Sequence, residues 1–257
     1  MKNKTLAALL AAMTLLCCLA GCAKKDETFT VGFDAEFPPY GYQDENGEYV
    51  GFDLDLAAEV CSRRGWTLEK KPIDWDSKDM ELDTGAIDCI WNGFTMNGRE
   101  DDYTWTDAYV DNTQVFVVPG GSGIQSAADL AGKAVVVQAA SSALSALSSE
   151  DNADLRASFK DLMEVPDYNT AFLNLEAGAV DAIALDVGVA DYQLANRTGF
   201  VKLPDPLSTE QYGVGFKQGN TALRDQVQET LLEMVEDGSF AEIAEKWGQS
   251  DMVCLGK

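Results

Sequence analysis

The sequence contains no histidine among its 257 residues. This absence excludes Ser-His-Asp and Cys-His catalysis, and it removes the usual zinc sites, which use imidazole. No G-x-G-x-x-G and no Walker pattern is present either, so a nucleotide cofactor is not expected. We therefore expect neither a cofactor nor a metal site, and an enzyme on this chain would have to use carboxylates, lysine or tyrosine.

Basic residues are scarce: 19 Lys and Arg stand against 43 Asp and Glu, which gives a formal net charge of −24. A nucleic-acid-binding protein needs a cationic surface against the phosphates, so this class of partner is excluded. Docking onto anionic lipid through a basic patch is excluded for the same reason. The plain interpretation of the charge is a well-solvated acidic surface.

Cysteines are few, and half of the six precede residue 23. The other three are Cys61, Cys89 and Cys254. An odd number without metal spacing predicts neither a disulfide framework nor a metal site. Cys61 falls at helical spacing after Leu54 and Cys89 lies in an apolar run, so we expect both thiols to be buried.

Only one long apolar run is present, from Leu6 to Ala20, and it follows the positive residues Lys2 and Lys4. This pattern is typical of a signal sequence rather than of a membrane span. The run closes with Leu19-Ala20-Gly21-Cys22, which resembles the lipobox of bacterial lipoproteins. The resemblance implies a signal peptide over 1–22, a lipid on Cys22, a linker over 23–27 and a membrane-tethered body. The alternative is an ordinary signal peptide with a chance cysteine.

The body of the chain is organised around residues 85–100. Ile87 to Trp91 reads as a buried strand after a turn signal, and a polar, glycine-punctuated loop follows it up to Arg99. Ligands of open α/β sheets lie beyond the carboxyl ends of strands. Arg99 is a fixed cation with a forked set of donors, so it suits a carboxylate.

The same pattern occurs a second time, because residues 82–90 align without gaps with residues 175–183. The offset of 93 residues is too long for a solenoid repeat and suits two similar α/β lobes. The second copy leads into a strand that ends at Asp186. One strand end therefore offers a cation and the other an anion, and together they could clamp a zwitterion.

Hydrophobic periodicity and turn residues predict the remaining elements. Strands are expected over 29–33, 67–73, 114–118, 134–138 and 211–216. Helices are expected over 53–64, 77–84, 141–147, 168–177, from after Asp186 to about 196, over 221–236 and over 239–247. A hairpin is expected at Asn46-Gly47, and a crossing between the lobes at 119–123.

Several motifs together resemble one family, the bacterial extracellular solute-binding proteins of family 3, which bind polar amino acids for ABC importers. The matching stretches are Val31-Gly32-Phe33-Asp34, Phe37-Pro38-Pro39-Tyr40, Gly51-Phe52-Asp53-Leu54-Asp55-Leu56, Gly85-Ala86-Ile87-Asp88, Gly93-Phe94-Thr95 with Arg99, Asp107-Ala108-Tyr109, and Val180-Asp181-Ala182 with Asp186. The resemblance implies an α/β, two-lobe, periplasmic-binding-protein-like (type II) fold with two crossover strands. It places lobe 1 at 28–118 and 213–257, and lobe 2 at 119–212.

The resemblance also assigns roles around the head group of an amino acid. Arg99 would bind the α-carboxylate, helped by Thr95 and by the helix start at Ser142. Asp186 and the backbone at Gly93 would bind the α-ammonium. The loop from Thr95 to Arg99 is one residue shorter than is usual in relatives.

A second group of residues is implied for the ligand side chain. Phe37 and Trp75 would form the walls, and Asp34 and Gln138 the polar end. Phe94 belongs to the matched motif and is counted with the site, although packing is also expected of it. With no further cation among these residues, the ligand side chain is expected to be polar-neutral or cationic rather than acidic.

Each assignment has a plain structural alternative. Arg99 could pair with Glu100 or Asp101 on the surface. Asp186 could only cap the following helix. Phe37 and Trp75 could be core aromatics, and Asp34 a turn residue.

The leading hypothesis for function is a receptor without chemistry. It would be a monomer, held outside the cytoplasm by the lipid on Cys22, and it would deliver an amino acid to the permease of an ABC importer. The alternative is an enzyme on the same scaffold, similar to cyclohexadienyl dehydratase, for which Glu36 is the available proton donor. A sensor ectodomain is a third option, and the lack of a second membrane span counts against it.

Overall fold

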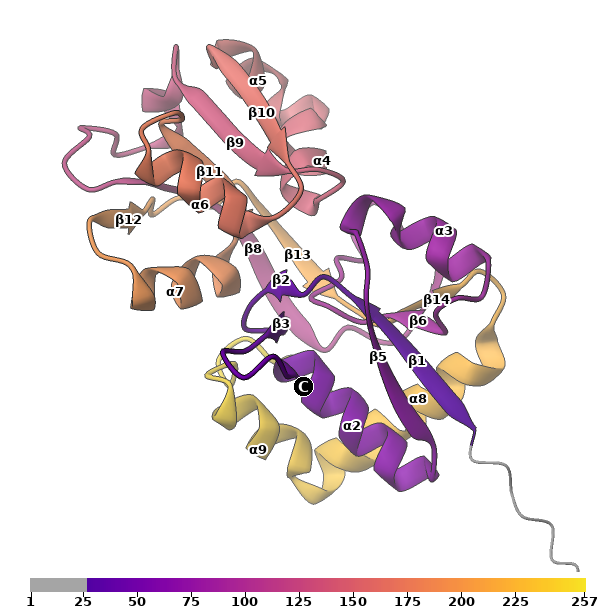
Figure 1. Ribbon diagram of the computed structural model, residues 1–257. Helices are drawn as coiled ribbons and strands as arrows, with labels where there is room; N and C mark the ends of the chain where they lie inside the picture. The colour runs from indigo at the N-terminus through magenta and orange to yellow at the C-terminus, as the bar shows by residue number, and fades with distance from the viewer. Residues whose placement is uncertain (1–26) are drawn as a thin grey trace, which may run out of the picture.

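The computed structural model describes residues 27–257, which fold around two large sheets (Figure 1). The first sheet has the order β5 (Thr67–Pro72), β1 (Thr28–Phe33), β6 (Cys89–Ile90), β14 (Gly215–Lys217) and β7 (Tyr103–Trp105). The second has the order β10 (Asp161–Val165), β9 (Ala134–Gln138), β11 (Ala182–Asp186), β8 (Val110–Pro119) and β12 (Phe200–Lys202), with β13 (Ser208–Tyr212) also paired to β8. A small sheet contains β2 (Glu36–Phe37), β3 (Gly41–Gln43) and β4 (Tyr49–Val50).

Helices cover both large sheets and give the molecule two lobes (Figure 1). The first lobe consists of the first and the small sheet with α2 (Phe52–Arg64), η1 (Trp75–Ser77), α3 (Lys78–Asp83), α8 (Thr221–Asp237) and α9 (Ser239–Lys246). The second lobe consists of the second sheet with η2 (Ala127–Leu130), α4 (Ser142–Ser148), η3 (Glu150–Asn152), α5 (Ala153–Ser158), α6 (Tyr168–Glu176) and α7 (Val187–Asn196). This arrangement confirms the predicted two-lobe α/β fold.

Two antiparallel strands, β8 and β13, run from one lobe to the other (Figure 1). Their register places Tyr212 opposite Val110 and Ser208 opposite Gln114. From Gln114 onward, β8 also pairs with β11 and β12, so this half of the strand belongs to the second sheet. The chain therefore crosses between the lobes before the predicted point at 119–123. The expected lobe limits, 28–118 with 213–257 and 119–212, remain predictions.

The repeated unit takes the same structure in each lobe. A helix, α3 or α6, is followed by a glycine with positive φ, Gly85 or Gly178, and then by a strand parallel to β1 or β9. The aspartate of each copy receives a backbone N–H from this parallel neighbour: Thr30 N donates to Asp88 Oδ2 at 2.7 Å, and Ala134 N donates to Asp181 Oδ2 at 2.9 Å. The repeat thus encodes the junction between a helix and the centre of a sheet.

Helix α2 shows how local sequence sets an element. Its apolar residues face the core, and Cys61 is buried among them. Gly65 adopts the left-handed conformation at φ 69° and donates its N–H to the carbonyls of Cys61 and Ser62, which ends the helix. The predicted burial of Cys61 and Cys89 is confirmed, and no disulfide joins cysteines within residues 27–257.

Several elements were not predicted, namely β7, β10, β12 and α5. Each is short, and the three strands lie at the edges of their sheets. Within the described part of the chain, no helix combines the length and apolarity needed to cross a membrane.

Candidate functional site

A narrow, nearly filled cavity lies between the two lobes, with a volume of about 10 Å³. Its lining residues are Phe37, Trp75, Gly93, Thr95, Arg99, Gln138, Ser141, Ser142 and Asp186. The structure therefore brings together all the predicted site residues except Asp34 and Phe94, and it adds Ser141. The two lobes contribute residues from strand ends and from the loops that follow them.

Arg99 reaches this cavity from the first lobe. Its Nη1 donates to the carbonyl of Thr95 at 3.1 Å, and its Nη2 donates across the lobes to the carbonyl of Ala140 at 3.4 Å. None of the ion pairs found within residues 27–257 includes Arg99, so the predicted alternative of a surface pair with Glu100 or Asp101 is not observed. The guanidinium is thus a half-buried cation without a carboxylate, and the short loop does not prevent it from facing the cavity.

Asp186 supplies a buried anion from the end of β11. Its Oδ1 accepts three hydrogen bonds: from Asn112 Nδ2 at 2.9 Å, from Gln114 Nε2 at 2.7 Å and from the Tyr212 hydroxyl at 2.5 Å. Burial raises the pKa of Asp186, and the neighbouring charge of Glu210 raises it further. Although Asp186 occupies the N-cap position of α7, its side chain makes no capping bond to the described chain. An ammonium group in the cavity would compensate this charge.

Gly93 is held by a second buried aspartate. Its N–H donates to Asp53 Oδ2 at 2.5 Å, and the Tyr109 hydroxyl donates to the same oxygen at 2.8 Å. Gly93 has φ 55°, and a Cβ there would lie only 3.0 Å from the ring of Phe37. Only glycine therefore suits this wall, and Asp53 fixes the direction of its peptide group.

The aromatic residues divide into wall and support. Phe37 and Trp75 line the cavity, whereas Phe94 is fully buried and stands edge-on to Trp75, with ring centroids 5.5 Å apart. The packing expected of Phe94 is observed, and Phe94 does not line the cavity: it stands behind Trp75, and the guanidinium of Arg99 lies 5.2 Å from its ring centroid.

Lys78 is a buried cation beside this wall that the sequence analysis missed. Only 4% of its surface is exposed, and its Nζ lies 5.3 Å from the ring centroid of Trp75. Burial lowers the pKa of its ammonium, and the charge of Arg99 adds to this effect. Lys78 does not line the cavity, yet it adds positive charge near Arg99.

Asp34 lies directly behind Gln138. The amide Nε2 of Gln138 donates to Asp34 Oδ2 at 2.6 Å, across the two lobes. Asp34 Oδ1 also accepts the N–H of Glu36 at 2.8 Å, so the side chain acts as a turn residue as well. Burial raises the pKa of Asp34 to about 6, which is the expected result for a carboxylate without a cationic partner.

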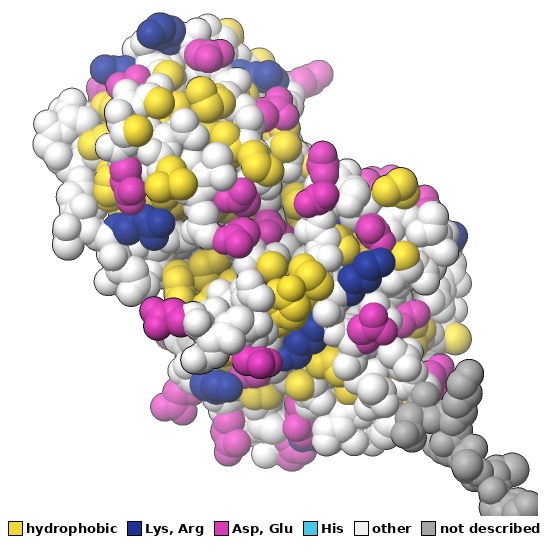
Figure 2. All heavy atoms as spheres, viewed as in Figure 1, with side chains coloured by type: hydrophobic (Ala, Val, Ile, Leu, Met, Phe, Trp, Pro, Cys, Tyr) yellow, Lys and Arg dark blue, Asp and Glu magenta, His cyan; other side chains and the backbone are white. Residues whose placement is uncertain are grey.

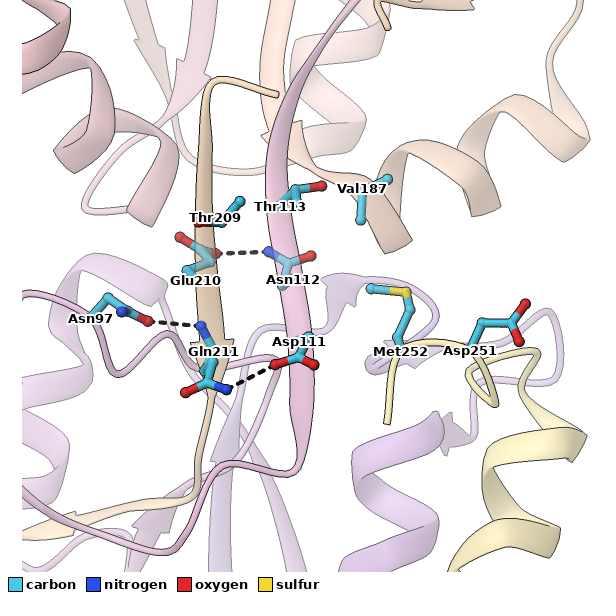
Figure 3. A pocket seen from close by; sticks show the side chains of 10 residues that line it. All are labelled: Asn97, Asp111, Asn112, Thr113, Val187, Thr209, Glu210, Gln211, Asp251 and Met252. Atoms are coloured by element: carbon cyan, nitrogen blue, oxygen red, sulfur yellow. Dashed lines mark hydrogen bonds between the residues drawn. The ribbon is translucent and has the colours of Figure 1, made fainter. Parts of the chain in front are cut away.

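Polar residues on the crossover strands bind Thr95, Ser142 and Asp186 from behind without lining the cavity, and sequence reasoning missed them. Figure 3 shows Glu210 on β13 facing Asn112 on β8, whose Nδ2 donates to Glu210 Oε1 at 2.7 Å. Gln114 and Tyr212 lie on the same face, two residues further along each strand. The sequence gives no alternation at these positions, because residues 111–114 and 208–211 are polar throughout, so it does not indicate which of their two faces is buried. Ser141, where a helix was expected to start, caps α4 by accepting the N–H of Leu144.

The surface agrees with the acidic composition. On the face drawn in Figure 2, acidic side chains outnumber basic ones and several lie where the lobes meet. Among residues 27–257, no cluster of three or more His, Cys, Asp or Glu residues could hold a metal ion. The site therefore offers fixed charges and hydrogen bonds to an organic ligand.

Comparisons with known proteins agree with this geometry. The family model of the bacterial extracellular solute-binding proteins, family 3, matches residues 29–250. The L-cystine-binding protein TcyJ of Escherichia coli (strain K12) is 28% identical over 236 residues, which are 89% of this chain and 85% of the relative.

Two solved structures extend the comparison. A substrate-binding protein of an ABC uptake transporter from Streptococcus pneumoniae with bound histidine has a TM-score of 0.82 and 34% identity, covering 86% of this chain and 92% of that one. An ancestral arginine-binding protein bound to arginine has a TM-score of 0.79 and 34% identity, covering 86% and 97%. Because the family model spans most of the chain and the two-lobe fold is shared, the protein belongs to the bacterial extracellular solute-binding proteins of family 3.

Proposed function

We propose that this protein captures an amino acid between its lobes, outside the cytoplasm, and delivers it to an ABC importer. One observation carries the proposal: a single cavity is lined by an unpaired cation of the first lobe, Arg99, and a buried anion of the second, Asp186. The two charges match the α-carboxylate and α-ammonium of a zwitterion. Relatives that bind cystine, histidine and arginine support the same class of ligand.

The ligand side chain is proposed to be cationic or polar-neutral, and the buried Asp34 favours a cation. Its carboxylate has only an amide and a backbone N–H as partners within the described chain. A guanidinium or ammonium would supply the missing charge, and the aliphatic stem that carries it would pack on Trp75. A cation–π interaction with this ring would add on the order of 0.5–2 kcal/mol to the binding free energy. An acidic side chain would face Asp34 without a partner.

Binding is favoured over catalysis. The named relatives are binding proteins, and Glu36, the proton donor required by the dehydratase alternative, is exposed and hydrogen-bonded to Asn169 rather than lining the cavity. A complete ammonium site at Asp186 also has no use in a reaction on a cyclic acid that lacks this group.

A lipid on Cys22 is proposed to tether the protein, which acts as a monomer. Cys22 lies outside the described residues, so the support comes from the sequence ending Leu19-Ala20-Gly21-Cys22. Replacing Cys22 by Ser is expected to release the protein from the membrane fraction of producing cells. Unchanged retention of the variant in that fraction would contradict the anchor.

Thermal unfolding in the presence of single amino acids tests the main proposal. L-Arginine, L-lysine, L-histidine, L-glutamine, L-cystine and L-glutamate would each be added, and a ligand at 100 times its Kd should add about 2.7 kcal/mol of stability. Asp186→Ala should lower the affinity for the true ligand at least tenfold, because the desolvated ammonium of the ligand loses its counter-charge. The proposal fails if no amino acid stabilises the protein, and the pocket assignment fails if glutamate binds most tightly.

A further inference from the structure

Glu210 is a buried carboxylate in contact with both lobes. It lies on the crossover strand β13, and only 7% of its surface is exposed. Its Oε1 accepts from Thr95 Oγ1 of the first lobe at 2.8 Å and from Ser142 Oγ of the second lobe at 3.3 Å. The amides of Asn112 and Gln114 donate to the same oxygen, at 2.7 and 2.8 Å. Four donors thus converge on one oxygen beside the cavity.

The hydroxyl donors matter because both also line the ligand cavity. A hydroxyl has a single proton to donate. Thr95 gives its proton to Glu210, and Ser142 does the same. Toward the cavity, the two hydroxyls therefore present lone pairs rather than protons.

The same arrangement leaves the guanidinium of Arg99 without a carboxylate partner within the described chain. Glu210, Arg99 and Ser142 line one adjoining hollow, yet Arg99 bonds only to backbone carbonyls within the described chain. The hydroxyls thus serve an internal anion, whereas the guanidinium stays open for an external one. A ligand carboxylate placed against Arg99 would lie close to Glu210, and like charges in a buried site repel each other.

We infer that Glu210 is an internal competitor of the ligand carboxylate, and that it lowers the affinity for the ligand. It does so by holding the protons of Thr95 and Ser142 and by adding a like charge beside Arg99. This inference rests on the proposed function, and it concerns how tightly the site holds its ligand. A receptor that must release its ligand to a permease has a use for such an element.

A purely structural role for Glu210 makes the opposite prediction. If the four hydrogen bonds only fasten the lobes and the crossover strands, then weakening them should loosen the site and reduce binding. If Glu210 competes, a neutral residue of the same shape should improve binding, because a neutral acceptor holds hydroxyl protons less strongly than a carboxylate.

Glu210→Gln is the decisive variant, measured by calorimetry with L-arginine, L-histidine, L-glutamine and L-cystine. The variant is expected to bind the amino acid preferred by the wild type about tenfold more tightly, since it gains hydroxyl donors and loses a like charge. The ratio of the affinity for this amino acid to the affinity for its α-carboxamide should increase as well, because the neutral carboxamide is not repelled by Glu210 in the wild type. Asp111→Asn is the matched control: it removes an exposed carboxylate of β8 that is bonded to Gln211, and it should change affinity less than about twofold.

A double-mutant cycle separates competition from a general change in shape. Thr95→Val should reduce affinity several-fold more in the E210Q protein than in the wild type, because only there is the Thr95 proton available to the ligand. Thermal unfolding of E210Q without ligand checks that the fold is kept. Unchanged or weaker binding by E210Q, or additive effects of the two substitutions, overturns the inference. If no amino acid binds to either protein, the proposed function fails and the inference fails with it; binding by E210Q alone supports both.

Discussion

Three aspartates hold buried carboxylates in or beside the cavity: Asp34, Asp53 and Asp186. Burial raises the pKa of each of them, to about 6 for Asp34 and about 7 for Asp53. Asp186 lines the cavity, where a ligand cation can compensate its charge, and Asp34 lies behind Gln138, whose amide it binds. Asp53 has no such compensation, because it is fully enclosed and its Oδ1 has no hydrogen-bond partner in the described chain. Its charge is therefore a standing cost to the folded state, offset by its hold on Gly93 and Tyr109.

Asp53→Asn is expected to change how stability depends on pH. An aspartate in the unfolded chain titrates near 4, whereas burial raises the pKa of Asp53 in the folded protein to about 7. Between these values the folded state binds more protons, so the free energy of unfolding falls as the pH rises through this window. Asparagine removes this loss, and the variant should gain roughly 2–3 kcal/mol relative to the wild type between pH 5 and pH 8. Urea unfolding at both pH values measures the difference.

The control for this prediction is Asp154→Asn, which removes an exposed carboxylate on α5 and the same formal charge. Its curve of stability against pH should follow that of the wild type. Asp34 and Asp186 also lower the free energy of unfolding as the pH rises, but they do so in all three proteins, so their effect cancels in the comparison. If the D53N curve runs parallel to the wild-type curve, Asp53 is not the buried titrating group described here.

The sequence could reveal Arg99 and Asp186 because each directly follows a predicted strand, and strand ends are where α/β proteins bind ligands. It could not reveal Glu210 or Gln114. Their direction depends on the register between β8 and β13, two strands separated by about ninety residues of chain, and a shift by one residue would turn both side chains away. For Phe94 the sequence leaves both a place in the site and packing open, since it does not tell which face of a loop is filled by η1 and Trp75.

At the scale of elements, the prediction was most successful where local signals are strong. The helix over Phe52–Arg64 ends at Gly65, and the strand over Ala134–Gln138 has the predicted bounds. The edge strands β10 and β12 have no comparable apolar run, and they become strands only by pairing with β9 and β8. The turn between β9 and α4 is the most constrained junction at the site, because Ala140 takes φ 54° there.

Replacing Ala139 or Ala140 in this turn by glycine should change the stability of the protein in opposite directions. A side chain in the left-handed region costs the folded state about 1–2 kcal/mol, so Ala140→Gly should relieve strain. The same substitution increases the conformational entropy of the unfolded chain, which lowers stability by about 0.5–1 kcal/mol. The net expectation is a gain of about 0.5 kcal/mol. Ala139 is not among the residues with positive φ, so Ala139→Gly should only lose about 0.5–1 kcal/mol. Chemical unfolding of both variants is the measurement, and a loss of stability in A140G as large as that in A139G would contradict the strain.

At the scale of the whole molecule, the lobes touch through a few contacts around the cavity. Gln138 of the second lobe donates to Asp34 of the first at 2.6 Å, and Arg99 donates to the carbonyl of Ala140 at 3.4 Å. On another side of the cleft, the rings of Tyr42 and Tyr192 lie 5.5 Å apart. The lobes are also joined by β8 and β13, so their relative position can respond to a ligand that touches both.

Gly188, in the first turn of α7, allows one of the closest approaches between the lobes. A Cβ at this position would overlap the hydroxyl of Tyr40 and lie 3.0 Å from its Cζ. Tyr40 belongs to the first lobe, is fully buried and donates its hydroxyl to Gln249, so it has little room to yield. Gly188→Ala should therefore act as a wedge that opposes closure, although alanine stabilises a helix by up to about 1 kcal/mol relative to glycine.

The expected result is a protein that remains folded but binds about tenfold less tightly, because the closed state is penalised by about 1.4 kcal/mol. X-ray scattering of the wild type should show a smaller radius of gyration with saturating ligand than without, and G188A should show a weaker decrease. Tyr40→Phe removes the overlapping hydroxyl, so adding it to G188A should restore part of the affinity, whereas alone it should cost only the bond to Gln249. If G188A binds and contracts as the wild type does, the approach of Tyr40 to Gly188 does not limit closure.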